Sequence, residues 1–275
     1  MTTKFVVDPN LFNVVKNVTQ KFNRDILKLV TLAGQIMLEN GAETYRVEDT
    51  IEHICRATNI KSVNTFATPT GIFICIQTPN DEYHTTIKRV TKRTTNLSKV
   101  YHVNNISRQF VLQEISITQA LSSLEELSHT HSLNILFSIF VTGVCSGFFA
   151  LLLGGALWDG MIATFCGGFI RLVAIILYNK DISGFLVNLV SGSITAMIAI
   201  LFSEILKVGH IDKIIIGSIM PLLPGIAITG AIRDTIYGDL VSGTSRGVEA
   251  LLIAISIASG VGIVLRVWLF LQGGL

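Results

Sequence analysis

The stretch "PLLPGIAITGAIRDTIYGD", residues 221–239, places two prolines and two glycines ahead of an Arg-Asp pair in an otherwise apolar part of the chain. Proline removes a backbone N–H, and its ring clashes with the preceding helical turn. Within a membrane, carbonyls that lose their partners need a neighbouring protein group or a water-filled cavity. The stretch therefore predicts an interrupted helix, and its role depends on the rest of the chain.

The charged residues are unevenly distributed along the chain. Of the 275 residues, 15% are charged and 50% are hydrophobic, whereas a soluble domain carries about 25% charged residues. Residues 1–130 hold 14 of the 21 Lys and Arg and 12 of the 19 Asp and Glu. We therefore expect a cytoplasmic α+β domain over residues 1–130 and a transmembrane domain over residues 131–275. The net charge of +2 gives no reason to expect a nucleic-acid partner.

Neither the N-terminus nor the cysteines point to a secreted or metal-binding protein. The opening "MTTKFVVDPNLF" lacks the apolar core of a signal peptide, so the first domain is expected to stay in the cytoplasm. Cys55, Cys75, Cys145 and Cys166 form no CxxC pair. We expect all four to be reduced and to bind no metal, and we expect no cofactor.

Five stretches approach the roughly 20 apolar residues that a helix needs to cross a membrane. They are residues 133–153, 158–178, 185–206, 214–232 and 248–271. The expected fold is thus a membrane bundle of five transmembrane helices, preceded by the small α+β domain. Because cytoplasmic loops favour Lys and Arg, the charges between the spans predict a cell-membrane protein with its N-terminal domain inside and its C-terminus outside.

Small residues recur every four positions in four of the spans, a spacing that lets membrane helices approach closely. The stripes are Gly143 and Gly147; Gly160, Thr164 and Gly168; Asn188, Gly192 and Ala196; and Ala250, Ala254, Ala258 and Gly262. They predict helices that pack on one another as well as on lipid. Arg266 continues the last stripe, so we expect it to face the bundle or a partner.

The soluble half reads as two helices followed by strands. Ile26, Leu29, Val30 and Ala33 keep a helical period, and Gly41 suits the left-handed position that ends a helix. "SVNTFATPTGIFICIQTPN" alternates like two strands around a Pro-Thr-Gly turn, and "EYHTTIKRVTK" is a candidate third strand. Residues 97–127 are again helical in pattern.

The charged cluster Glu43, Arg46, Glu48 and His53 is the chief chemical candidate of this half, and its role stays open. Acids near a helix start and surface ion pairs are the simpler explanation. The soluble half, residues 1–130, contains no GxSxG, Walker or HExxH motif, and His53 has no second histidine at helical spacing. We therefore expect no catalytic residues and no metal site.

Two long motifs resemble the threonine/serine exporter family. They are "ENGAETYRVEDTIEHICRATN", with the "ATPTGIFI" turn after it, and "MPLLPGIAITGAIRDTIYGDLVSGTSRGVEALLIAISIASG". The resemblance runs from about residue 25 to the end. It implies a transporter that exports threonine and serine or small dicarboxylates such as succinate. In the family's split form, a chain with a soluble domain and five spans pairs with a short membrane protein, and this chain resembles that first component.

The interrupted stretch then becomes the expected substrate site, because transporters place sites at discontinuous helices near the middle of the membrane. Ser218, Pro221, Gly225 and Thr229 fall on one helical face, and Pro224 adds to the break. A structural kink without solute contact is the alternative. Arg171 is a second substrate-binding candidate, since charges inside spans are costly, although it could instead extend to the cytoplasmic surface.

Four further acidic or basic residues are candidates for coupling or gating. They are Glu204, named for proton coupling, and Arg233, Asp234 and Asp239, which could equally anchor the topology.

An odd number of spans leaves no two equal inverted halves, so we expect a second membrane subunit, with a homo-oligomer as the alternative. Gly262 and Arg266 are the expected interface. The competing interpretation of the whole chain is a membrane-tethered enzyme whose catalytic centre lies in residues 25–130.

Overall fold

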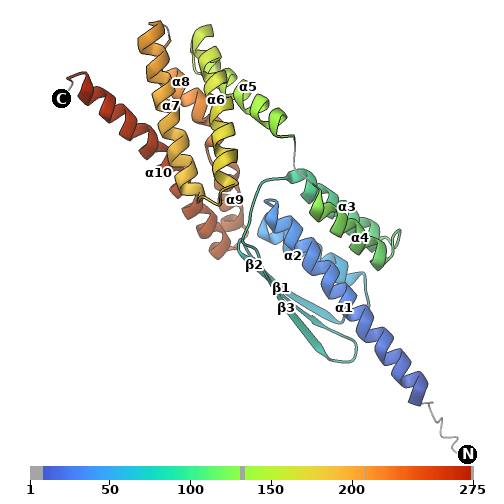
Figure 1. The fold of residues 1–275 in the computed structure, drawn as a ribbon. Coiled ribbons are helices and arrows are strands. Elements are labelled where there is room, and N and C mark those ends of the chain that lie inside the picture. The colour runs from blue at the N-terminus through green and yellow to red at the C-terminus, as the bar shows by residue number, and fades with distance from the viewer. Residues whose placement is uncertain (1–8, 131–133, 208, 274–275) are drawn as a thin grey trace, which may run out of the picture. The chain divides into compact units, whose positions relative to one another are not determined.

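The computed structural model describes residues 9–130, 134–207 and 209–273. They form two compact units, coloured along the chain in Figure 1. Unit 1 contains the described residues up to 130 together with Ile232–Thr244, and unit 2 contains residues 134–231 and those from Ser245 onward. The inclusion of Ile232–Thr244, which we call the corner segment, in unit 1 was not predicted from the sequence.

Unit 1 contains four helices and three strands within its described N-terminal part. These are α1 (Pro9–Glu39), α2 (Thr44–Arg56), β1 (Ser62–Thr68), β2 (Gly71–Gln77), β3 (Tyr83–Arg89), α3 (Leu97–Val111) and α4 (Ile117–His129). The predicted helix break and all three predicted strands are confirmed. Gly41, with φ +90°, ends α1 in the left-handed conformation that glycine adopts without strain. The helical pattern predicted over residues 97–127 is two helices, separated by residues 112–116.

The core of unit 1 lies between one face of the antiparallel sheet and α1 and α2 (Figure 1). The strand order is β1-β2-β3, and Phe73 pairs with Phe66 on one side and Ile87 on the other. Alternation puts Ile72 and Ile74 of β2 in the core, fully buried. The predicted helical stripe of α1 is buried against them, including Ile26 and Leu29.

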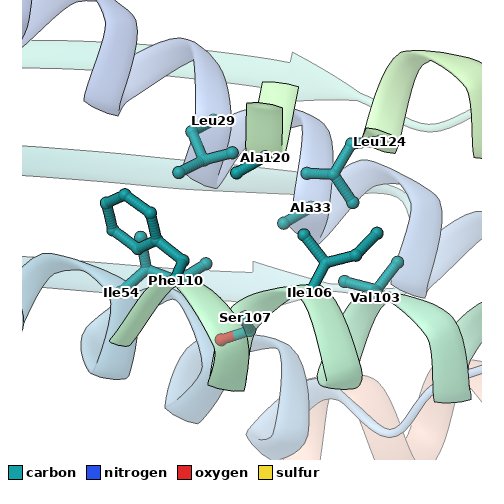
Figure 2. Close-up of a pocket in the computed structure, with 9 residues that line it drawn as sticks. All are labelled: Leu29, Ala33, Ile54, Val103, Ile106, Ser107, Phe110, Ala120 and Leu124. Atoms are coloured by element: carbon teal, nitrogen blue, oxygen red, sulfur yellow. The ribbon is translucent and has the colours of Figure 1, made fainter. Parts of the chain in front are cut away.

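A second part of this core joins the helices (Figure 2). Side chains of α1, α2, α3 and α4 meet around a narrow apolar space with no room for a water molecule. Among the residues that line this space, Ser107 has the one polar side chain, and Phe110 has the one aromatic ring (Figure 2). This space is packed core and is not a binding site.

The regular elements among the described residues of unit 2 are all helices, joined by short turns. Its elements are α5 (Ile135–Leu152), α6 (Leu157–Tyr178), α7 (Gly184–Leu206), α8 (Ile211–Ile219), the 3-10 turn η1 (Met220–Leu222), α9 (Gly225–Ile236) and α10 (Leu240–Leu271), the last two ending or beginning in the corner segment. Four described helices, α5, α6, α7 and α10, are long and apolar enough to cross a membrane. The segments Ile211–Leu222 and Gly225–Ile236 meet at a 53° bend and make a fifth candidate span if they count as one.

The predicted boundaries hold for the first three spans and change for the last two. The span expected over residues 214–232 is broken by η1, as the two prolines predict. The last helix begins at Leu240 instead of residue 248. Gly238, with φ +91°, ends α9, and the Gly243 N–H donates to the Asp239 carbonyl at 2.8 Å to start α10. Most of the residues between the last two expected spans are therefore helical.

The small-residue stripes of α5 and α6 meet, as predicted. A Cβ on Gly143 would lie 2.7 Å from the Thr164 carbonyl oxygen, and one on Gly147 would lie 2.8 Å from the Gly160 carbonyl oxygen. No real side-chain carbon fits at these distances from backbone atoms. The two helices therefore pack backbone to backbone, which fixes the frame around the broken span.

Candidate functional site

The broken span is built from a short helix, a turn and a second helix. Pro221 lies in η1, Leu223 is extended, and Pro224 precedes α9. The hydroxyl of Thr229 donates to the Gly225 and Ile226 carbonyls, each at 3.1 Å, so this side chain bonds its own helix. The break thus exists, and its predicted residues lie at or just after it.

The predicted single polar face along this span is not continuous. Ser218 is buried, with 1% of its surface exposed, whereas Pro221, Gly225 and Thr229 are exposed in this chain. The bend of 53° separates the two groups. A helical wheel assumes a straight axis, and the prolines remove that condition.

Ser218 instead joins a buried group of small polar side chains, which we call the hydroxyl cluster: Ser146, Cys166, Thr195 and Ser218. The Ser146 hydroxyl donates to the Thr142 carbonyl at 3.0 Å, and it lies 3.5 Å from the Ser218 carbonyl oxygen. Cys166 lies beside Ser218 and Thr195. Among the described residues, the Ser218 hydroxyl has no hydrogen-bond partner of ordinary geometry. The cluster brings α5, α6, α7 and α8 together, and Ser218 lies two residues before η1.

Arg171 lies half-buried on α6 and bonds the neighbouring helix. Its Nε donates to the Ser138 hydroxyl of α5 at 2.9 Å. Within the described ranges it makes no ion pair with a carboxylate. Ser138 orients the guanidinium, a planar group with further N–H donors.

The corner segment is held by the start of α2. Arg233 pairs with the Glu43 carboxylate, and the Tyr45 and Tyr237 rings stack with centroids 4.3 Å apart. The Thr44 hydroxyl donates to the Asp239 carboxylate at 3.0 Å. We call these three contacts the latch. It gives the cluster around Glu43, whose role the sequence left open, a defined partner.

Arg46 and Glu48, on the first turns of α2, lie next to the latch residues. The Arg46 Nε lies 3.2 Å from the second Glu43 oxygen. Glu48 accepts the Ala67 N–H of β1 at 2.7 Å. Burial raises the pKa of the Glu48 carboxyl above its usual range, and the nearby Asp239 carboxylate adds to the rise.

Asp234 and Glu204 differ in their surroundings. Asp234 is fully buried in the corner segment, and its carbonyl accepts the Asp239 N–H at 2.9 Å. Glu204 lies near the end of α7 with 43% of its side chain exposed, 3.5 Å from Lys207 and 3.2 Å from Gln272. Its setting is that of a surface ion pair.

The predicted partner interface is exposed along its second half. Ala250 is buried, but Ala258, Gly262 and Arg266 are exposed, and nothing lies within 4 Å of a Cβ built on Gly262. Another face of the same part of α10 packs on α7, since the Ser193 hydroxyl of α7 donates to the Gly260 carbonyl at 3.1 Å. The exposed part leaves room for another protein or lipid.

Sequence reasoning missed one charged pair in unit 2. The Asp159 carboxylate, at the start of α6, is fully buried and lies 3.0 Å from the Nδ1 of His210, the residue before α8. Each residue looked like part of a loop, and 51 positions separate them. An acid inside a predicted span was the one available signal.

A polar groove of about 400 Å³ lies between α2 and α3 of unit 1. Its lining includes Asp49, His53, Asn104 and Arg108. Among the described residues, no group of three or more His, Cys, Asp or Glu could hold a metal ion. Burial raises the pKa of the Cys55 thiol to about 12, so this cysteine is not a reactive thiolate.

Four or five apolar helices of this kind define a multi-pass membrane protein. Residues 28–268 match the family model described as "ThrE: Putative threonine/serine exporter". The chain therefore belongs to the threonine/serine exporter family, a family of transporters. Its resemblance to that family, noted from two motifs, is confirmed.

Three curated relatives show how the match is distributed. The "Probable threonine/serine exporter" of Mycobacterium tuberculosis is 23% identical over 251 residues, which cover 88% of this chain but 46% of that relative. Two proteins named "Probable succinate transporter subunit YjjP" match 95% of their own length, at 23% identity in Klebsiella aerogenes and 22% in Escherichia coli. No solved structure is significantly similar to the chain.

Proposed function

We propose that this chain is a subunit of a proton-coupled secondary transporter that exports threonine, serine or a small dicarboxylate such as succinate. The observation that carries the proposal is a broken span inside a membrane bundle of the exporter family. All these solutes bear a carboxylate. The names of the relatives support both solute classes and do not choose between them.

The solute site in this proposal lies at the break. Half-helix ends present unpaired N–H and C=O groups there, as discontinuous helices do in other transporters. Pro221, Pro224, Gly225 and Thr229 form the flexible wall. Arg171 supplies a two-pronged donor for the carboxylate, held in place by Ser138.

The latch links the soluble domain to this span. The last turn of α9 lies in the corner segment, and Arg233 on that turn pairs with Glu43. Because α9 begins at the break, a change in the latch acts directly on the helix that borders the proposed site. Arg233, Asp234 and Asp239 are thus gating residues in this account.

A second membrane subunit completes the transporter. The word "subunit" in the names of two relatives, which match over 95% of their own length, supports this. The exposed surface around Gly262 and Arg266 is the proposed contact, since an arginine facing lipid is expensive. Self-association of this chain is the alternative, and no nucleic acid is involved.

The proposed topology places five spans in the cell membrane, unit 1 in the cytoplasm and the C-terminus outside. It predicts that a cysteine added after Leu275 reacts with an impermeant thiol reagent in intact cells, whereas one at Lys180 reacts only after lysis. Labelling at Lys180 with protection after Leu275 would reverse the orientation.

A membrane-tethered enzyme is the second candidate, and the polar groove of unit 1 is the feature that would serve it. Residues Asp49 and His53 lie 3.5 Å apart at its edge, but both side chains are mostly exposed. Packed spans around a broken helix are more than an anchor requires. We therefore favour the exporter.

The test is solute retention in cells. Cells that make the chain with its membrane partner should hold less internal threonine, serine or succinate, and release more, than cells without it. Arg171→Gln should lose this difference at a normal protein level. If the two cell lines held the same internal concentration and released the same amount of every solute in the panel, the proposal would be refuted.

A further inference from the structure

We infer that His210 and Asp159 together form the site at which the exporter takes up its coupling proton. The inference rests on the proposed function and names a residue pair for it. It replaces Glu204, whose exposed ion pair has the features of an ordinary surface contact.

The two side chains of the pair differ in their exposure to water. The Asp159 side chain is 0% exposed, whereas the His210 side chain is 66% exposed. The carboxylate lies 3.0 Å from the ring Nδ1. A proton that arrives from water on the open side of the imidazole is thus balanced at once by a buried negative charge. Histidine is the side chain that changes charge most readily between pH 5 and 8.

The Asp159 carboxylate also caps the starts of two helices. One of its oxygens accepts the Ala156 N–H at 2.7 Å, at the start of α6, and the other accepts the His210 N–H at 2.6 Å, at the start of α8. A negative charge is favourable at both helix N-termini. Protonation of the ring changes the net charge of the pair from −1 to 0. The proton therefore alters the electrostatics at the start of α8.

Helix α8 connects the pair to the broken span. This helix runs from Ile211 to Ile219 and leads straight into η1 and the break. Ser218, in its last turn, lies in the hydroxyl cluster. A shift of α8 that follows protonation at one end is therefore transmitted to the proposed solute site at the other.

The pair also lies at a defined end of unit 2. The pair joins the α5–α6 turn to the α7–α8 turn. The chain enters unit 2 at the opposite end of α5, so in the proposed topology the pair faces the outside. An exporter driven by inward proton flow takes up its proton from that side.

Other charged groups at this end pair locally. Glu204 and Lys207 of the α7 end lie 3.5 Å apart, as do Asp212 and Lys213 of the α8 start. The described parts of residues 135–156, which include α5, carry no Asp, Glu, His, Lys or Arg. Arg266 lies on α10, and Gln272, just after that helix, donates to the Glu204 carboxylate at 3.2 Å. Of the groups named here, only His210 contacts the buried carboxylate.

The experiment uses inside-out vesicles from cells that make the chain together with its membrane partner, with interior pH varied and exterior pH fixed. The vesicle interior corresponds to the outside of the cell. Uptake of labelled threonine or succinate should rise about five- to tenfold as interior pH falls from 7.5 to 5.5, the range in which a histidine titrates. His210→Gln should change by less than about twofold over that range. Gln keeps the backbone N–H to Asp159 and removes the ionisable ring.

The control and the alternative variant make each outcome decisive. Asp212→Asn, on the same helical turn, should keep the wild-type pH profile. If His210→Gln is poorly made, His210→Arg serves instead, since its charge is also independent of pH and its profile should also be flat. A His210→Gln profile parallel to wild type, at whatever rate, would overturn the inference. Wild-type uptake no faster than in vesicles without the chain would instead refute the proposed function.

Discussion

Removing Arg233 from the latch should loosen the corner segment by a measurable amount. The Glu43 side chain is 17% exposed and that of Arg233 is 49% exposed, so the pair is only partly shielded from water. Exposed ion pairs contribute about 0.2–1 kcal/mol, and this one belongs near the upper end, about 1 kcal/mol. Arg233→Ala should therefore raise the opening equilibrium of the segment about fivefold.

Amide hydrogen exchange measures this opening directly, because exchange of protected amides reports local unfolding. In Arg233→Ala, amides of residues 43–48 and 232–240 should exchange about fivefold faster than in the wild-type chain. The matched control is Arg56→Ala, which breaks the exposed 2.8 Å pair with Glu52 on the same helix and should leave these amides unchanged.

A double variant tests whether the effect belongs to the pair. Glu43→Ala should accelerate exchange strongly in the wild-type background and less in the Arg233→Ala background, with a coupling of about 1 kcal/mol. Unchanged exchange in Arg233→Ala, or equal acceleration in the control Arg56→Ala, would show that the latch does not hold the segment.

Three further variants test the packing, the carboxylate donor and the buried acid. Gly147→Ala should lower the stability of the bundle by about 1–3 kcal/mol, because its Cβ meets the backbone of α6; Gly262→Ala, where the space is open, should not, and equal melting temperatures in detergent would count against the helix contact. Arg171→Lys keeps the charge and loses the fork, so export should fall at constant protein level, and normal export by Arg171→Gln would remove this residue from the site. The pKa of the Glu48 carboxyl is raised, so ionised Glu48 lowers the stability of the fold at pH values above that raised pKa. Below the ordinary pKa of a glutamate, this loss of stability is absent. Glu48→Gln should therefore unfold at a higher temperature than wild type at pH 7.5 and at the same temperature at pH 4, and a lower melting temperature at pH 7.5 would contradict this.

Much of the fold follows from local sequence patterns. The stripe that contains Ile26 and Leu29 repeats with the helical period, and the alternation through Ile72 and Ile74 repeats with the strand period. The membrane spans follow from length and hydropathy, and the break follows from Pro221 and Pro224. These features depend on neighbours in the sequence, so they can be predicted without an alignment.

The rest depends on contacts between distant residues. Glu43 and Arg233 are 190 positions apart, and no periodicity connects them. Asp159 and His210 each have the local sequence of a turn, and only the folded helices bring them together. The single polar face predicted through Ser218 was wrong because the helix axis bends there. The sequence therefore predicts a candidate site when all its residues lie in one segment, as in the broken span, and misses one built from distant segments.

The direct test of the central claim is solute efflux from liposomes that contain the purified chain and its membrane partner. Liposomes preloaded with labelled threonine, serine and succinate should release at least one of them faster when the outside is made acidic, and empty liposomes should not. Release at the rate of empty liposomes for every solute, with both proteins folded and inserted, would contradict the account. Conversion of any of these solutes to a product by the purified chain would favour the tethered enzyme instead.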